Sequence, residues 1–178
     1  MKYLTGILAM GCPCELDSCG LWNLGKSDFT SEEKFLLVES EDMPFKDFGI
    51  EKNKLVPYRD YTVYNVANHV RAYVDMLYLH KFEGMHDLFV DAINERKCRL
   101  SIFECVYRCR HLAQYRKMNE FMCEEFGNAW VSYKDAVEKA AESLEAASEE
   151  YNRLISGNNT MGVARDDIRQ KIKNAVSN

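Results

Sequence analysis

The sequence lacks any hydrophobic run of the roughly 20 residues that a membrane-spanning helix needs. Its first residues, MKYLTGILAMGCPCELD, contain one lysine and an apolar run of about seven residues that stops before Gly11 and Pro13. This run is too short and too weakly basic for a secretory signal. We therefore expect a cytoplasmic protein, in which the seven cysteines are reduced thiols rather than a disulfide framework.

Two common motifs of dinucleotide and zinc chemistry are also missing. The chain contains no GxGxxG, and no histidine belongs to an HExxH arrangement that would present two imidazoles to one zinc ion. The four histidines are scattered instead: His69, His80, His86 and His111. We expect a protein that has no cofactor and is not an enzyme.

Proline is scarce, and all three prolines precede residue 62. The rest of the chain is therefore free to be helical. Residues 3–9 and 34–39 are short apolar runs separated by turn-forming glycines, which predicts a small hairpin or sheet. The predicted fold class is α+β and predominantly helical. We expect a single domain over 1–178, with an irregular or β head (1–62), a helical core (63–127), and a long helix with a short return helix (128–178).

Spacings of three and four residues predict four helices in the core. In the first, Asn65 is the expected N-cap and Val66, Val70, Tyr73, Val74 and Leu77 face inward. The second spans 83–94. The third opens at Ser101, where Glu104 completes a capping box, and its apolar stripe is Ile102, Cys105, Val106, Cys109 and Leu112. The fourth spans 114–126 and turns Tyr115, Met118, Phe121 and Met122 inward.

The longest predicted helix runs over 128–155, with no internal glycine or proline and with Gly157 placed to end it. Its apolar residues alternate at three and four, the period of a coiled coil: Trp130, Tyr133, Val137, Ala140, Leu144, Ala147, Tyr151 and Leu154. Residues 161–176 could fold back as a partner helix. An intramolecular hairpin and a homodimer through the 130–154 seam are both compatible with this pattern.

Charge is distributed unevenly along a chain whose net charge is -5. Segment 96–117 has seven basic residues and one acid, whereas segment 118–156 has nine acids and three basic residues. The first is a candidate nucleic-acid contact, formed by Arg96, Lys97, Arg99, Arg108, Arg116 and Lys117. The second could imitate nucleic-acid phosphates in a basic groove, through Glu138, Glu142, Glu145 and Glu149. For each set the alternative is an ordinary solvated surface.

Three cysteines, Cys12, Cys14 and Cys19, lie in a Gly- and Pro-containing segment. Three close thiolates could hold a soft metal if a fourth ligand came from elsewhere, although their CxCx4C spacing differs from the paired CxxC of zinc ribbons. The alternative is a tight turn with small, partly buried side chains. No histidine is close to these cysteines in sequence, so a Cys-His nucleophilic pair could form only through space.

Several segments together suggest a family. They are Leu4-Thr5-Gly6-Ile7-Leu8-Ala9, Pro13-Cys14-x-Leu16, Gly20-x-Trp22, Phe48-Gly49-Ile50-Glu51 and Tyr64-Asn65-Val66-Ala67-Asn68-His69-Val70-Arg71-Ala72. This pattern, over roughly residues 3 to 130, resembles small proteins carried on mobile elements of gut bacteria. Some proteins of this size and setting are anti-CRISPR inhibitors of the type II effector nuclease. Those relatives carry Asp-Trp-His where this chain has Leu21-Trp22-Asn23.

The resemblance, the opposed charges and the missing catalytic motifs favour a non-enzymatic inhibitor. The specific hypothesis is an anti-CRISPR protein that binds a guide-loaded type II nuclease and blocks DNA binding or cleavage. Its partner would be this ribonucleoprotein of the host, with no membrane involved. One alternative is a small RNA- or DNA-binding regulator of a mobile element, and another is a small Cys-dependent or zinc-dependent enzyme.

Overall fold

The structure is a computed structural model, which describes residues 1–16, 24–59, 62–86 and 96–157. The chain divides into two compact units, Met1–Trp130 and Val131–Asn178. The first unit is an α+β structure, as the sequence predicted, with a four-stranded mixed sheet.

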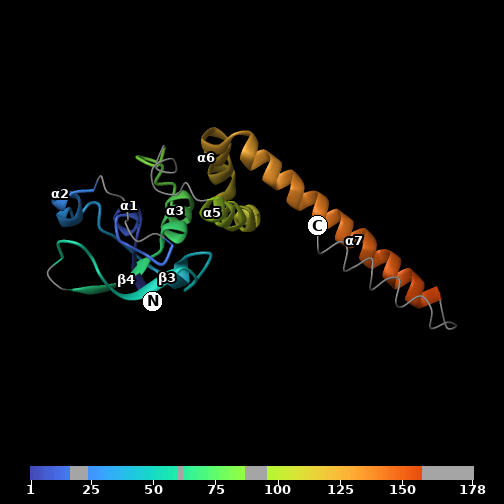
Figure 1. The fold of residues 1–178 in the computed structure, drawn as a ribbon, viewed down its shortest axis with the longest axis horizontal. Coiled ribbons are helices and arrows are strands. Elements are labelled where there is room, and N and C mark those ends of the chain that lie inside the picture. The colour runs from blue at the N-terminus through green and yellow to red at the C-terminus, as the bar shows by residue number, and fades with distance from the viewer. Residues whose placement is uncertain (17–23, 60–61, 87–95, 158–178) are drawn as a thin grey trace. The chain divides into compact units, whose positions relative to one another are not determined.

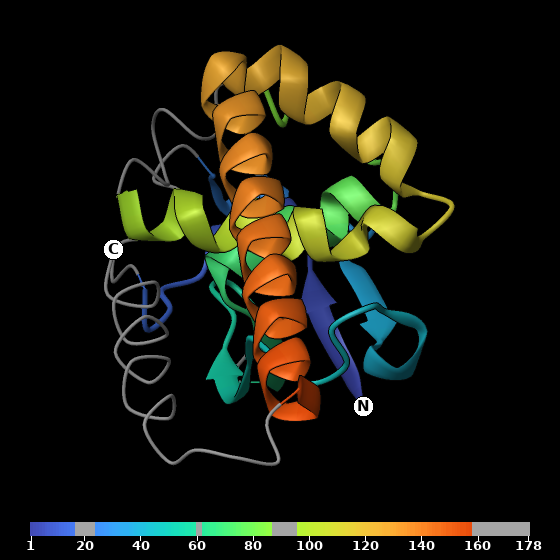
Figure 2. The same cartoon turned by 90° about the vertical axis from the view of Figure 1, so that its right-hand side faces the viewer.

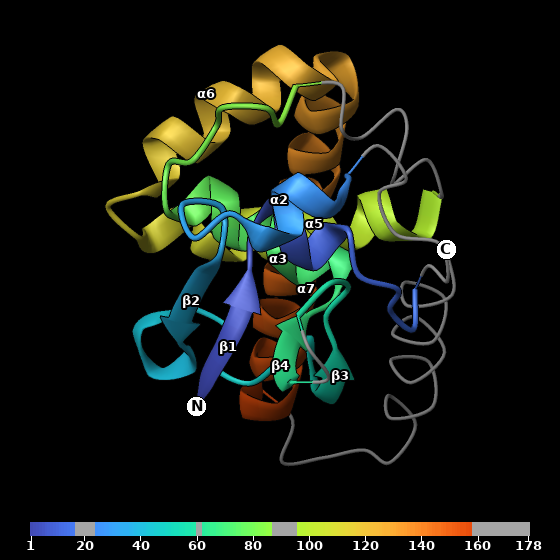
Figure 3. The same cartoon turned by 90° about the vertical axis from the view of Figure 1, so that its left-hand side faces the viewer.

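The sheet has the strand order β2-β1-β4-β3 (Figure 3). Strand β1 (Lys2–Thr5) pairs antiparallel with β2 (Leu36–Glu39) and parallel with β4 (Val63–Ala67), and β4 pairs antiparallel with β3 (Ile50–Leu55). A register shift interrupts the last pairing between Glu51 and Lys54. Asn53 stands there at a φ of 56°, a backbone conformation that asparagine tolerates better than most residues.

The N-terminal strand is shorter than the apolar run over 3–9 suggested. Gly6 has a φ of 76°, so the extended chain turns there. Residues Ile7–Met10 form a single helical turn, α1, whose last three side chains are buried. Two further short helices follow in this half of the chain, α2 (Lys26–Thr30) and the 3-10 helix η1 (Ser40–Asp42).

Helix α3 (His69–Tyr78) is the centre of the first unit, and every residue from His69 to Leu77 is buried. It contacts β1, β4 and α1 on the sheet side and α5 and α6 on the other (Figure 1). The predicted start of this helix was wrong, because 63–67 form β4 and the N-cap is Asn68. Asn65 instead donates a hydrogen bond from its amide to the carbonyl of Lys2 at 3.1 Å, across the sheet.

The outer helices of this unit are α5 (Arg96–Arg108) and α6 (Tyr115–Phe126), joined through the 3-10 turn η2 (Cys109–His111) (Figure 2). The predicted capping box at Ser101 was wrong, because α5 begins at Arg96 and Ser101 lies inside it. The apolar stripe of α5 is buried as predicted through Cys109, whereas Leu112 is exposed. In α6, Met118, Phe121 and Met122 are buried, as predicted.

Helix α7 (Asn128–Gly157) is one continuous element, as the absence of internal glycine and proline predicted. Its first turn belongs to the first unit, where Trp130 is fully buried with its ring edge-on to Phe103 and its Nε1 donating to Asn119. The remainder of α7 is the described part of the second unit. Residues 87–94 of the predicted second helix, and the predicted return helix over 161–176, lie outside the described residues. Among the described residues no helix has the length and apolar character of a membrane span.

Candidate functional site

Two segments that carried the family resemblance meet at the start of α3. The backbone N–H of Asn68 donates to the carbonyl of Gly49 at 2.8 Å, and the Asn68 side chain accepts from the backbone N–H of Arg71 at 2.9 Å. Gly49 has a φ of 73°, and a Cβ at this position would lie 2.9 Å from Cβ of Arg71. The close approach of the two segments therefore requires glycine here.

Arg71 and Asp75 form a buried ion pair that ties these segments to β1. Nε of Arg71 donates to Asp75 at 2.7 Å, and the other guanidinium nitrogens donate to the Phe48 carbonyl and the Tyr3 hydroxyl at 2.7 Å each. Asp75 also accepts from the hydroxyls of Tyr3 at 2.6 Å and Thr5 at 2.8 Å. Each ionic group is thus bonded by several polar partners, as a buried pair requires.

Cys14 lies beside this framework and is half-buried. Its thiol interacts electrostatically with His69, the first residue of α3. Burial alone would raise the pKa of this thiol, but the hydrogen bonds to His69, its charge and the Leu16 N–H together lower it. Such surroundings favour the thiolate more than those of an isolated cysteine do.

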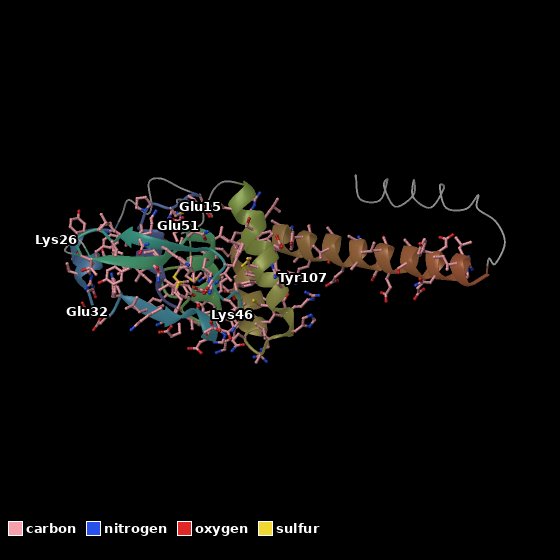
Figure 4. The ribbon with its side chains drawn as sticks, turned by 90° about the horizontal axis from the view of Figure 1, so that it is seen from below. Glu15, Lys26, Glu32, Lys46, Glu51 and Tyr107 are labelled. Atoms are coloured by element: carbon pink, nitrogen blue, oxygen red, sulfur yellow. The ribbon has the colours of Figure 1, made fainter. Side chains whose placement is uncertain are left out.

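Glu51 on β3 organises the chain beside the thiol. Its carboxylate accepts from the backbone N–H of Glu15 at 2.7 Å and pairs with Lys54 at 2.7 Å (Figure 4, where Glu15 and Glu51 lie close together). Lys54 also interacts electrostatically with Cys14 and Cys12. The hydrogen bond between the Glu15 N–H and Glu51 therefore attaches the segment that follows Cys14 to the sheet.

Of the three cysteines predicted as possible metal ligands, the structure describes Cys12 and Cys14. Cys12 is buried, donates its S–H to the Leu8 carbonyl at 3.3 Å, and has a pKa that burial raises to about 12. Cys19 lies outside the described residues. Within 1–16, 24–59, 62–86 and 96–157, no group of three His, Cys, Asp or Glu side chains is arranged to hold a metal ion.

The predicted basic residues lie in two places, at the start of α5 and around the junction of α5 with α6. Arg96, Lys97 and Arg99 belong to its first turn, while Arg108 ends it, and Arg116 and Lys117 open α6. Arg99 is half-buried, and Arg108, Arg116 and Lys117 are exposed. From Arg99 to Arg108 the helix rises about 14 Å, so these residues form two groups.

Two of these arginines already have acidic neighbours. Arg108 is 4.0 Å from Glu104, and Arg116 is 3.3 Å from Glu120, each one helical turn apart. Arg108 also lies over the ring of Phe45 and borders an open hollow of about 340 Å³, whose lining includes Glu41 and Asp42. Acidic neighbours weaken the attraction of such a surface for phosphates.

The predicted acidic residues all lie exposed on α7 beyond Trp130. If Trp130 is position a of the heptad, the apolar seam occupies positions a and d, and Glu138, Glu142, Glu145 and Glu149 occupy positions b and f. Positions b and f are on the side of a helix opposite a and d. The seam is itself exposed at several points, with Leu144 at 67% and Tyr151 at 42%. This part of α7 therefore has one apolar face and one acidic face.

No family model matches the chain, and neither the curated proteins nor the solved structures gave a match.

The electrostatic interaction of Cys14 with His69 was not predicted from the sequence. The two residues are far apart in the chain, and the parallel pairing of β1 with β4 places the start of α3 near the end of α1. The available signal was that both residues belong to segments of the resemblance.

Proposed function

We propose that this protein is a non-enzymatic interaction protein that acts through α7, most specifically as an anti-CRISPR inhibitor of a guide-loaded type II effector nuclease. The observation that carries the proposal is the division of α7 into an exposed apolar seam and an exposed acidic face. A helix of this kind can associate through one side while it presents carboxylates on the other.

The occupant proposed for the seam is the same seam of a second copy of this chain. Its three-and-four alternation matches itself, which is the requirement of a coiled coil. Leu144 and Tyr151 of the seam are exposed by 67% and 42%, so pairing would remove apolar surface from water. Ala140 and Ala147 would allow close approach but bury little area, which makes the expected dimer a weak one.

The occupant proposed for the acidic face is the basic groove in which the nuclease receives DNA. From Glu138 to Glu149 the helix rises about 16 Å, and the carboxylates at 138, 142, 145 and 149 recur at intervals of three or four residues. A row of fixed negative charge on a rigid rod is complementary to a surface that binds phosphates. The resemblance to proteins of mobile elements supports the choice of this nuclease.

The direct test is cleavage of a matched DNA by a guide-loaded type II nuclease, with and without the purified protein. We expect inhibition by the wild type and its loss in E138Q/E142Q/E145Q/E149Q, which removes four charges and keeps good helix formers. A control with the same charge change in the first unit, E33Q/E41Q/E83Q/E124Q, should inhibit as the wild type does. Inhibition that survives the α7 substitutions, or that both variants lose equally, would contradict the assignment of this face.

Absence of inhibition across several such nucleases would contradict the proposed partner class. Binding to free guide RNA or free target DNA, with an affinity that falls steeply with salt, would instead favour the nucleic-acid regulator. In that case R108Q/R116Q/K117Q should weaken binding and reduce the salt dependence, because each removes a phosphate contact.

A further inference from the structure

The accessible part of the α7 seam begins beyond its first two positions. The Trp130 side chain is fully buried in the first unit, and Tyr133 is half-buried. In the stretch 137–154, the four inner seam residues are exposed and the two outermost are half-buried. This stretch therefore has six seam residues that a second helix could cover: Val137, Ala140, Leu144, Ala147, Tyr151 and Leu154.

The sizes of these side chains are poorly matched in a parallel pair of α7 helices. Parallel helices in register place each seam residue opposite its own copy. Ala140 and Ala147 would then each face an alanine, whereas Leu144 would face a leucine and Tyr151 a tyrosine. Two tyrosines hold the helices further apart than two alanines do. The alanine layers would therefore enclose unfilled space, which lowers stability.

The same side chains are complementary when one helix is reversed. An antiparallel pair that is centred on the middle of the stretch places Leu144 opposite Ala147 of the second copy, and Tyr151 opposite Ala140. The two outermost residues, a valine and a leucine, then face each other at each end. Every large side chain inside the stretch meets a small one, so the two helices can keep one close distance along their length.

We propose that α7 pairs with α7 of a second copy in the antiparallel orientation, over residues 137–154. This inference rests on the seam pairing of the proposed function and adds its orientation and register. A shift by one heptad in either direction is less favourable, because it brings two large side chains together. One shift places Tyr151 opposite Tyr133, and the other places Leu144 opposite Leu154.

The residues beside the seam distinguish the two orientations. Positions e and g of this stretch hold Ala141, Ser143 and Ser148, which are small and exposed, together with Glu150. Residues at e and g contact the partner helix at the sides of a coiled coil. In the antiparallel pair Ser143 lies beside Glu150 of the second copy, whereas in a parallel pair it lies beside Ser148. A charge placed at residue 143 therefore meets an acid only if the helices are antiparallel.

The test is the dissociation constant of the dimer, measured by sedimentation equilibrium of the full-length protein in a reducing buffer of low salt. S143K forms two Lys–Glu pairs across the antiparallel dimer, and we expect the dissociation constant to fall about three- to fivefold. S143E should raise it by a similar factor. The matched control S132K makes the same change at an exposed serine on the outer side of α7 and should leave it unchanged.

Effects within a single helix cannot imitate this order. The Ser143 hydroxyl donates to the Lys139 carbonyl at 2.8 Å, so the hydrogen bond that both substitutions remove is internal to α7. Lys139 lies one helical turn before residue 143 and favours glutamate over lysine there. Helix stability alone would therefore favour S143E, the reverse of the order expected for the dimer.

Equal dissociation constants for the wild type, S143K and S143E would overturn the antiparallel orientation. A tighter dimer of S143E/S148K would also overturn it, because that variant forms Glu–Lys pairs only across a parallel dimer. A wild-type chain that stays monomeric would remove the seam pairing of the proposed function, and this inference with it. Nuclease inhibition is read from the acidic face on the other side of α7, so its absence would contradict the proposed partner and leave the orientation to the sedimentation result.

Discussion

At the scale of single residues, Arg71 and Asp75 join parts of the chain that are distant in sequence. Their side chains are 1% and 0% exposed, and together they bond to β1, to the turn at Phe48 and to each other. A charge in such a place is costly unless it is paired and hydrogen-bonded. The same residues also fix Asn68 and Gly49, and through them the position of His69.

Removal of one member of this pair should be strongly destabilising. In Arg71→Met, Asp75 loses its cation, and we expect the free energy of unfolding to fall by about 3–5 kcal/mol. Urea unfolding followed by circular dichroism would measure this. The double variant R71M/D75L should recover part of the loss, because no buried charge is left unpaired. A loss below about 1 kcal/mol for R71M, typical of an exposed pair, would contradict this account.

The lowered pKa of Cys14 predicts a pH-dependent contribution to stability. A group whose pKa is lower in the folded state stabilises the fold fully above its unfolded pKa, and this stabilisation is lost as pH falls through its folded pKa. Cys14→Ser should therefore cost more free energy of unfolding at about pH 9.5 than at about pH 6. Chemical denaturation at both pH values is the measurement.

Cys12→Ser is the natural contrast, because the pKa of Cys12 is raised to about 12. Above the unfolded pKa of about 8.5, ionisation of this thiol favours the unfolded chain. The cost of C12S should therefore become smaller as pH rises, the reverse of the trend for C14S. The same trend in both variants would contradict the assigned directions.

At the scale of elements, α3 shows why the sequence predicted the helix but placed its first residue wrongly. Segment 63–67 has valines and a tyrosine whose spacing is compatible with a strand as well as with a helix. Two asparagines, Asn65 and Asn68, could each have capped the helix. Pairing of β4 with both β1 and β3 draws 63–67 into the sheet, and only tertiary contacts of this kind resolve the choice.

Substitution of the two asparagines should separate these roles. Asn68→Ala removes the side chain that accepts from the Arg71 N–H and should lower the free energy of unfolding by about 1 kcal/mol. Asn65→Ala removes one partly exposed hydrogen bond to the Lys2 carbonyl and should cost less. Thermal unfolding of both variants would test the order. A larger effect at Asn65 would contradict the cap at Asn68.

The apolar seam of α7 makes a prediction about association. Leu144 is at the middle of the seam and is 67% exposed. Leu144→Glu would place a carboxylate at an a position of each paired helix and should abolish the dimer. Sedimentation equilibrium over a range of concentrations would measure this, with Glu142→Gln on the opposite face as the control. A wild-type chain that stays monomeric at high concentration would remove the basis for the seam pairing.

At the scale of the whole molecule, the chain separates into two units whose boundary falls inside α7, directly after Trp130. The indole is fully buried against Phe103 and bonded to Asn119. The helix therefore begins as part of the core of the first unit and continues as an element with mostly exposed side chains. The sequence predicted the helix and its period. The heptad pattern did not reveal that Trp130, the first residue of the seam, is part of the core of the first unit.

This difference predicts unequal effects along one seam. Trp130→Ala should lower the free energy of unfolding of the first unit by about 3–5 kcal/mol, as for other large buried aromatic residues. Tyr151→Ala, at the same heptad position but 42% exposed, should leave that free energy nearly unchanged. Urea unfolding followed by tyrosine fluorescence would compare them. Similar losses in both variants would contradict the division at Trp130.

The candidate sites were predictable to different degrees. The acidic face of α7 follows from helical geometry alone, because residues at b and f share a side wherever the helix is regular. Arg108, Arg116 and Lys117 were correctly placed on helices. Arg96, Lys97 and Arg99 were expected to precede the helix at Ser101, whereas they lie in α5, which begins at Arg96. The pairs of Arg108 with Glu104 and of Arg116 with Glu120 follow from the i,i+4 spacing of a helix. The electrostatic interaction of Cys14 with His69 depends on the strand order, which no local pattern encodes.

The apolar seam and the acidic face lie on opposite sides of α7. The rotation of the helix between successive residues therefore decides whether each face stays continuous when the helix changes length. An insertion of seven residues after Ala147 turns the distal part by only about 20° relative to the proximal part, so both faces stay continuous. An insertion of five residues turns it by about 140°, which would bring Tyr151 round towards the side of Glu142. Evolution could therefore lengthen this helix in steps of a heptad and retain two separate surfaces, whereas most other changes of length would mix them.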